Sequence, residues 1–419
     1  MIRGILFFAT LISIALVVLA CAGATEAPVP PTALPTETPF PPTATAQPMP
    51  TATPEPTPTP GPRGEIAVLK DVLWLIDLEG GEPRRLGDWF PTYSHLFFRW
   101  SPDGEKIVYG EQADLWVLDA ETGETRNLTN TPDRWELKPS WSPDGTKIAF
   151  TSRPMEPEEY GQTESTMFGV FGGHLTIVGA DGIGYRVVDE QGTISSPSWA
   201  PDSMRLAYAA ADGNLYIFDL ERGQREQISL EEYGLQSDLY IYAPSWSPQG
   251  DAIAISFSTR PAPEETSAEK GYAILDLSNQ TSVILKRFIV KETMAYEGMP
   301  SGEHIGGCGG PPALWNPSGD YLLLRILPLP RTDLNGSLSL IDAKGEQEIV
   351  LEGKYGAYQA DWSPDGRWVA YVDLGDRLVY VVDPFNPEER WLYKEPEAEA
   401  APGHYSAEGL AWRPIEGAP

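Results

Sequence analysis

The sequence predicts an all-β protein, a seven-bladed β-propeller of four-stranded antiparallel blades, closed by the N- and C-terminal segments in one blade. Three observations predict this fold. A Trp-Ser-Pro-Asp-Gly motif and its variants recur along residues 64–419, short apolar runs follow each full copy, and proline and glycine supply 41 and 40 of the 419 residues. This density of turn-forming residues fits many short strands joined by tight turns.

The chain begins with a segment typical of a secretory signal. Residues 5–20 are almost entirely apolar and end directly before a cysteine. The run Val18-Leu19-Ala20-Cys21 resembles the lipobox of bacterial lipoproteins, in which the cysteine thiol receives the lipid. The resemblance implies a signal peptide over residues 1–21, lipid attachment at Cys21, and an extracytoplasmic, membrane lipid-anchored protein at the cell surface or in the periplasm. An uncleaved membrane anchor is the alternative.

Residues 22–63 are predicted to form a disordered stalk. They contain 14 proline and 10 threonine residues. Proline fixes φ and removes a backbone donor, so neither a helix nor a sheet ladder is expected here. We expect a spacer that holds the following domain away from the membrane, with a ligand for a proline-recognition domain as the alternative.

The repeated motif defines the blades. Its full and degenerate copies begin at Trp100, Trp141, Trp199, Trp246, Trp315 and Trp362, with a partial copy at Trp412 and motif aspartates Asp103, Asp144 and Asp365 in the full copies. Proline and glycine suit a tight turn, aspartate bonds nearby backbone amides, and tryptophan seals neighbouring sheets, so we interpret these residues as structural. Metal binding or catalysis by Asp103 or Asp144 is the alternative. The pattern resembles the TolB-like β-propeller family, which implies one propeller domain over residues 64–419.

The two ends of the repeat region complement each other. Residues 66–87 have the pattern of the second, third and fourth strands of a blade, whereas residues 409–414 have the pattern of a first strand alone. Pairing the two segments makes a seventh blade and leaves no exposed sheet edge.

Length variation is predicted to fall on one face of the ring. The longer loops are expected near residues 153–173, 259–270 and 327–336 between second and third strands, and near 89–97, 230–243, 286–312 and 394–409 between blades. Up-and-down strand order places both kinds of loop at the same end, and loops on a rigid scaffold commonly carry binding residues. The predicted ligand-binding face comprises Trp89, Tyr93, His95, Trp135, Tyr240, Tyr242, Tyr296, His304, Trp391 and Tyr405.

His304 and Cys308 lie in a glycine-rich stretch, and their roles stay open between structural, metal-binding and catalytic. No helix is predicted to fix their spacing, so we predict no metal site and no cofactor.

Charge and missing motifs limit the function. The chain has 60 acidic and 30 basic residues and a formal charge of −30, which argues against a nucleic-acid partner. No Gly-x-Ser-x-Gly, phosphate-loop or His-Glu-x-x-His pattern is found. We therefore predict a non-enzymatic, monomeric propeller that binds a protein, peptide or glycan. The alternatives are a hydrolase or lyase acting on an extracellular polymer, and a structural or sensory ectodomain.

Overall fold

The computed structural model describes residues 61–69, 72–86, 98–155, 173–193, 195–259, 267–291, 312–326, 337–352, 357–373, 378–393 and 409–414. The predicted signal peptide with Cys21, and nearly all of the predicted stalk, lie outside these residues. Within the described residues, no helix has both the length and the apolar character needed to cross a membrane.

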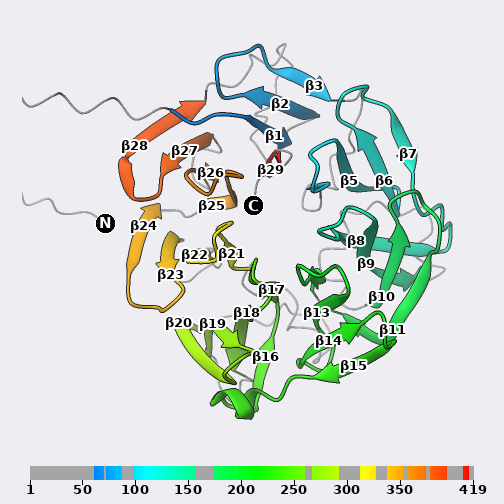
Figure 1. Ribbon diagram of the computed structural model, residues 1–419, viewed down its shortest axis with the longest axis vertical. Helices are drawn as coiled ribbons and strands as arrows, with labels where there is room; N and C mark the ends of the chain where they lie inside the picture. Colours follow the sequence, from blue (N-terminus) through cyan, green and yellow to red (C-terminus); the bar gives the residue numbers. More distant parts are fainter. Residues whose placement is uncertain are drawn as a thin grey trace, which may run out of the picture. The chain divides into compact units, whose positions relative to one another are not determined.

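The chain from residue 60 onward forms one unit, in which seven antiparallel sheets are arranged around a central axis (Figure 1). The predicted fold class is confirmed. We number the blades by the order of their motif tryptophans, so that blade 1 contains Trp100, blade 6 contains Trp362, and blade 7 is the closing blade. The first-named strand of each blade is the innermost, except in blade 4, where β16 and β17 both pair with the inner side of β18 and β17 lies nearer the axis (Figure 1).

The first four blades follow the chain in order. Blade 1 consists of β4 (Arg99–Trp100), β5 (Lys106–Glu111), β6 (Asp114–Asp119) and β7 (Thr125–Asn127). Blade 2 consists of β8 (Arg134–Trp141), β9 (Lys147–Pro154), β10 (Gly173–Gly179) and β11 (Arg186–Thr193). Blade 3 consists of β12 (Ser198–Trp199), β13 (Arg205–Ala209), β14 (Leu215–Asp219) and β15 (Gln224–Gln227). Blade 4 consists of β16 (Leu239–Ile241), β17 (Ser245–Trp246), β18 (Ala252–Thr259), β19 (Ser267–Asp276) and β20 (Thr281–Lys291).

The remaining blades complete the ring. Blade 5 consists of β21 (Leu314–Trp315), β22 (Tyr321–Ile326), β23 (Ser337–Asp342) and β24 (Glu348–Glu352). Blade 6 consists of β25 (Ala357–Trp362), β26 (Val369–Asp373), β27 (Val379–Asp383) and β28 (Asn386–Tyr393). Blade 7 consists of β29 (Gly409–Trp412), β1 (Glu65–Leu69), β2 (Leu73–Asp77) and β3 (Arg84–Leu86).

Blade 7 joins the two ends of the repeat region, as the sequence predicts. The last strand, β29, pairs antiparallel with the first, β1, so that Trp412 lies opposite Ile66. Arg413 extends this junction to blade 1. Its side chain forms an ion pair with Glu65, donates from Nε to the carbonyl oxygen of Gly104 at 2.8 Å, and lies over the Trp100 ring.

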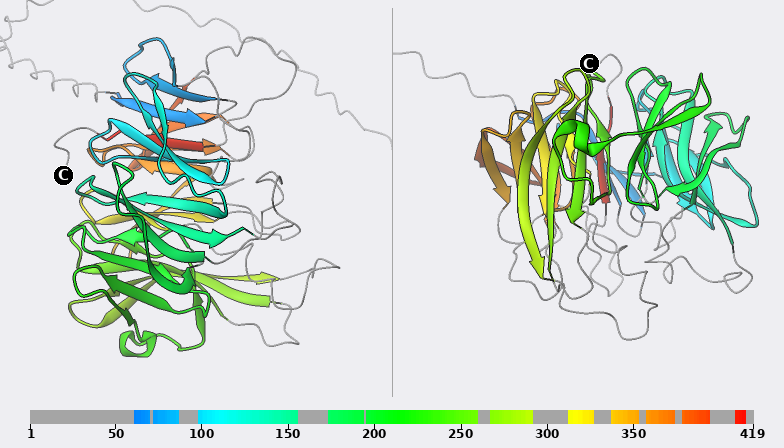
Figure 2. Two further views of the ribbon diagram at one scale, coloured as in Figure 1. Left: turned by 90° about the vertical axis from the view of Figure 1, so that its right-hand side faces the viewer. Right: turned by 90° about the horizontal axis from the view of Figure 1, so that it is seen from below.

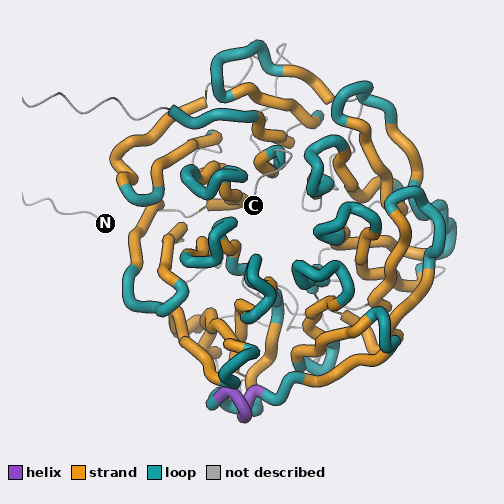
Figure 3. The backbone as a smooth tube through the Cα atoms, in the orientation of Figure 1, coloured by secondary structure: helices purple, strands orange, loops and turns teal. Residues whose placement is uncertain are grey.

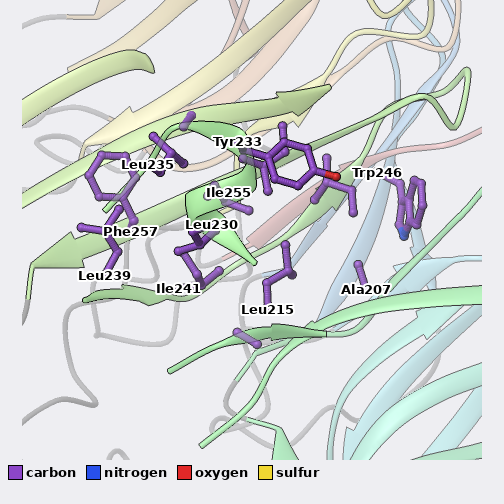
Figure 4. Close-up of a cluster of buried hydrophobic side chains, with 14 of the residues drawn as sticks. Ala207, Leu215, Leu230, Tyr233, Leu235, Leu239, Ile241, Trp246, Ile255 and Phe257 are labelled. Carbon is purple, nitrogen blue, oxygen red and sulfur yellow. The ribbon is translucent and has the colours of Figure 1, made fainter. Parts of the chain in front are cut away.

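The hydrophobic core lies between adjacent blades. Each cluster of buried side chains combines residues from two neighbouring sheets. In the cluster of Figure 4, Leu215 of blade 3 packs with Ile255 and Phe257 of blade 4, and Leu230 and Tyr233 add to the same cluster. Burial at these interfaces explains why the repeated apolar runs specify a ring of stacked sheets.

Some predicted loops contain regular structure. The stretch 230–243, expected to be a loop, contains the 3₁₀-helix η3 (Leu230–Tyr233) and strand β16, which pairs with β18 (Figure 3). Strands β19 and β20 also continue into the stretches 259–270 and 286–312 that were expected to be loops. Loops were expected there because these stretches are not continuous apolar runs. They form strands because pairing with β18 and within the β19–β20 hairpin stabilises extended backbone beyond the apolar core.

The strands run between two faces of the ring (Figure 2). We call one the turn face, which carries the Trp-Ser-Pro-Asp-Gly turns and the connections between third and fourth strands. The other, which we call the loop-bearing face, carries the connections between second and third strands and between blades.

Candidate functional site: the inner ring of the central channel

The motif turns are held by their own side chains. In blade 1 the Ser101 hydroxyl donates to Asp103 at 2.5 Å and accepts from the amide of Lys106 at 2.8 Å. Although partial burial opposes the effect, the bonds from Ser101 and from the amide of Glu105 lower the pKa of Asp103. The same arrangement lowers the pKa of Asp144 to about 2. Turn chemistry therefore accounts for the contacts of these carboxylates.

The motif tryptophans link each blade to the one before it. In five of the seven blades, the indole Nε1–H donates to a backbone carbonyl oxygen on the innermost strand of the preceding blade. These bonds run from Trp100 to Ala411, Trp141 to Arg99, Trp199 to Ser140, Trp315 to Ser245 and Trp362 to Leu314, at 3.0–3.3 Å. The accepting residue always stands immediately before the tryptophan of its own blade, so this position is fixed next to the axis.

At the other two junctions a side chain of the preceding blade accepts a hydrogen bond from the backbone amide of the tryptophan instead of from its indole. The Ser198 hydroxyl accepts the backbone amide of Trp246 at 3.0 Å, and a carboxylate oxygen of Asp361 accepts the backbone amide of Trp412 at 2.8 Å. The indole nitrogens of Trp246 and Trp412 are buried without a hydrogen-bond partner among the described residues.

The residues before the seven tryptophans form what we call the inner ring. They are Arg99, Ser140, Ser198, Ser245, Leu314, Asp361 and Ala411. Five are small, hydroxylated or apolar, and two are charged. Arg99 is exposed, whereas the other six are half-buried or buried.

Arg99 and Asp361 interact electrostatically although blade 7 separates their blades, which places both charges near the axis. Burial raises the pKa of Asp361 to about 6, against the opposing effects of two backbone amides, Arg99 and Arg325. Surrounding protein also lowers the pKa of the Arg99 guanidinium, an effect that the charge of Asp361 opposes. The carboxylate of Asp361 is therefore poorly hydrated, which increases the strength of electrostatic contacts made there.

A hollow of about 410 Å³ opens at this level of the channel. It is lined by residues of blades 2 to 6, namely Pro143, Trp199, Pro201, Ser245, Trp246, Ser247, Pro248, Leu314, Trp315 and Asp361. Its walls combine indole and proline surface with one carboxylate, a composition typical of sites that accommodate part of a ligand.

The predicted ligand-binding residues have mixed positions. Trp135 is 3% exposed, and Trp391 packs edge-on against Trp368 with ring centroids 4.8 Å apart. Tyr240 and Tyr242 are half-buried. The others, together with Cys308, lie outside the described residues: Trp89, Tyr93, His95, Tyr296, His304 and Tyr405. The ligand-binding assignment of all ten residues stays a prediction.

A buried carboxyl near the loop-bearing face was missed at the sequence level. Glu136, on β8, is 1% exposed, and its Oε1 accepts hydrogen bonds from Thr131, Ser152 and Tyr185 at 2.8–3.2 Å. Its Oε2 has no partner in the described part of the chain. Burial raises the pKa of Glu136 to about 7. The described residues contain no cluster of three or more potential metal ligands.

The family model for the dipeptidyl peptidase IV N-terminal region matches residues 68–137. An uncharacterised peptidase of Bacillus subtilis is 40% identical over 73 residues, which are 16% of this chain and 11% of that protein. Dipeptidyl-peptidase 5 of Porphyromonas gingivalis is 29% identical over 149 residues, 32% of this chain and 20% of that protein. The chain thus spans less than two thirds of the length of these relatives.

Two solved structures illustrate what this chain is similar to at low sequence identity. TolB from Acinetobacter baumannii is 19% identical with a TM-score of 0.45, over 70% of this chain and 64% of that one. An oligogalacturonate lyase from Vibrio parahaemolyticus is 12% identical with a TM-score of 0.51, over 72% of this chain and 80% of that one. With its seven blades and Trp-Ser-Pro-Asp-Gly turns, the chain has the β-propeller fold that its sequence resemblance to TolB-like proteins implies.

The prediction of a non-enzyme is wrong. It was drawn from missing catalytic motifs, yet two relatives that share sequence with this chain are named peptidases, and the matching family is a region of a dipeptidyl peptidase. The missing motifs were a poor basis for that prediction, because neither a fold nor the absence of a few searched motifs determines function.

Proposed function

We propose that this protein is a membrane-anchored, extracytoplasmic binding module that takes a segment of a peptide into the hollow beside its inner ring. The observation that supports this is the pair of charges in the inner ring. Five other blades fill the same position with serine, leucine or alanine and still form the ring, so the blade repeat does not require Arg99 or Asp361 to be charged. A poorly hydrated charge such as that of Asp361 costs stability, and such groups are typical of binding sites.

Peptides are favoured over glycans as the ligand class by sequence similarity. The relatives with shared sequence are named peptidases, whereas the lyase shares only the fold with this chain. A folded protein partner would contribute such a segment as an exposed loop or terminus.

The test is selection of ligands from a random-peptide display library on purified residues 22–419, followed by affinity measurements on a channel-blocked variant. Ser245→Trp places a large side chain in the hollow, and Ser245 donates no side-chain hydrogen bond within the described residues. Ser278→Trp, at an exposed turn of the same blade, is the control. We expect the first variant to weaken binding at least tenfold with an unchanged melting temperature, and the second to bind normally. Equal binding by both would refute a channel site.

A second candidate function is supported by the family match. In this candidate function, the protein is an enzyme that cleaves a peptide or another extracellular polymer. Release of the chromophore from dipeptidyl p-nitroanilides, or formation of unsaturated products absorbing near 235 nm from oligogalacturonate, would support it. No turnover of either substrate at micromolar protein would leave the binding role as the better account.

We also propose the domain organisation on which this location depends. Residues 1–21 are a lipoprotein signal peptide, 22–63 a stalk and 64–419 the propeller, with the lipid on Cys21. Metabolic labelling with an alkyne fatty acid should mark the wild type and leave Cys21→Ser unlabelled. Labelling of the variant, or recovery of the wild type without lipid in the aqueous phase, would contradict the anchor.

A further inference from the structure

Arg99 has hydrogen-bonding capacity that the described part of the fold does not use. Its Nη1 donates to the carbonyl oxygen of the neighbouring Phe98 at 2.9 Å, and its other guanidinium donors have no partner among the described residues. It is not within ion-pair distance of Asp361, whose two oxygens already accept the amides of Trp362 and Trp412. Arg99 is therefore an exposed residue of the innermost strand β4, with guanidinium donors that no described residue uses.

The basic character of this region contrasts with the whole chain. Acidic residues outnumber basic residues by 60 to 30, yet the residues nearest the axis include Arg99 and, in a bulge of the innermost strand β8, Lys138. Arg325 adds a third positive charge, close enough to act on Asp361. A negatively charged group is repelled by the outer surface and finds positive charge in the channel, which favours selective rather than general binding.

We propose that Arg99 binds a carboxylate of the peptide ligand, from an aspartate or glutamate side chain or from the C-terminus, inside the inner ring. This inference rests on the proposed function. The guanidinium presents parallel donors that match the two oxygens of a carboxylate, a geometry that a lysine ammonium cannot reproduce. Asp361 is a positioning residue, because it fixes the junction of blades 6 and 7 and attracts the guanidinium without bonding to it.

The test is a double-mutant cycle on a peptide selected from the display library. The peptide and a counterpart with its carboxylates converted to amides are measured against wild type, Arg99→Gln and Arg99→Lys. We expect Arg99→Gln to weaken binding of the acidic peptide about ten- to a hundredfold, the range of a charge-assisted bond, and to leave the amide peptide nearly unchanged. Arg99→Lys should restore part of the affinity. Arg222→Ala, at an exposed turn of blade 3, is the control and should behave as wild type.

The outcomes separate the two proposals. Selected peptides that are neutral or basic, or an Arg99→Gln effect equal for both peptides, would overturn carboxylate recognition and leave the binding role standing. Recovery of no peptide would overturn both. If Arg99→Gln lowers the melting temperature, the cycle still decides, because a folding defect weakens both peptides alike whereas carboxylate recognition weakens only the acidic one.

Discussion

At the scale of single residues, three charged groups have environments that folding alone does not explain. Arg99 and Asp361 replace the uncharged residues that most blades use at the inner ring, and Glu136 is buried with one oxygen unpartnered among the described residues. The inner-ring charges have a sequence signal, since aligning the seven motif copies shows Arg and Asp where five copies have Ser, Leu or Ala. Glu136 has none, because its burial depends on blade 1 packing against blade 2.

Glu136 should make stability fall as pH rises. Its pKa is raised from 4.5 to about 7 in the folded chain, so its stabilising contribution is complete below about pH 4.5 and is lost as pH rises through about 7. At 1.36 kcal/mol per unit, the loss is roughly 3 kcal/mol. We expect Glu136→Gln to gain stability relative to wild type by that order between pH 4.5 and pH 8.

Urea unfolding across this pH range measures the effect. Glu226→Gln, at an exposed position on β15, is the matched control and should follow the wild-type pH profile. Parallel profiles for wild type and Glu136→Gln would show that the Glu136 carboxyl is not perturbed by folding.

At the scale of elements, the motif tryptophan does more than its sequence context predicts. Turn chemistry and aromatic bulk can be deduced from Trp-Ser-Pro-Asp-Gly, and both are present. The indole hydrogen bond could not be deduced, because its acceptor is a carbonyl on the preceding blade, 42 or more residues away. Dependence on distant partners also explains why loops were expected in the stretches that form η3, β16 and the ends of β19 and β20.

Two tryptophans offer a matched comparison of this bond. Trp141 and Trp246 are 8% and 6% exposed, yet the indole of Trp141 bonds to the Arg99 carbonyl whereas that of Trp246 has no partner among the described residues. We expect Trp141→Phe to cost about 1 kcal/mol more than Trp246→Phe, since it removes a part-buried hydrogen bond that Trp246 lacks. Chemical denaturation measures both free energies of unfolding. A larger loss at Trp246 would show that the interblade bonds contribute little.

At the scale of the whole molecule, the closing blade makes folding depend on both ends of the propeller. The sequence predicts this closure because residues 66–87 lack a first strand and residues 409–414 have no following strand. The identity of the ligand has no comparable signal. It depends on side chains from blades that meet at the axis, and a linear pattern does not show which residues converge there.

Truncation should reveal this dependence. A chain ending at residue 408 loses β29, the buried Trp412 and the Arg413 contacts, and leaves the edge of β1 unpaired. We expect loss of the cooperative thermal transition and association visible by size-exclusion chromatography. A chain ending at residue 414 retains β29 and should melt as wild type. A cooperative transition at the wild-type temperature in the shorter chain would argue against closure by β29.

Binding of the ligand beside the inner ring is the central claim. Hydrogen–deuterium exchange of the propeller, with and without a selected peptide, tests this directly. We predict slower exchange on binding for backbone amides of residues 98–101 and 357–362, on innermost strands of blades 1 and 6. Protection confined to the outermost strands, such as 186–193 and 281–291, with no change at the inner ring, would contradict it.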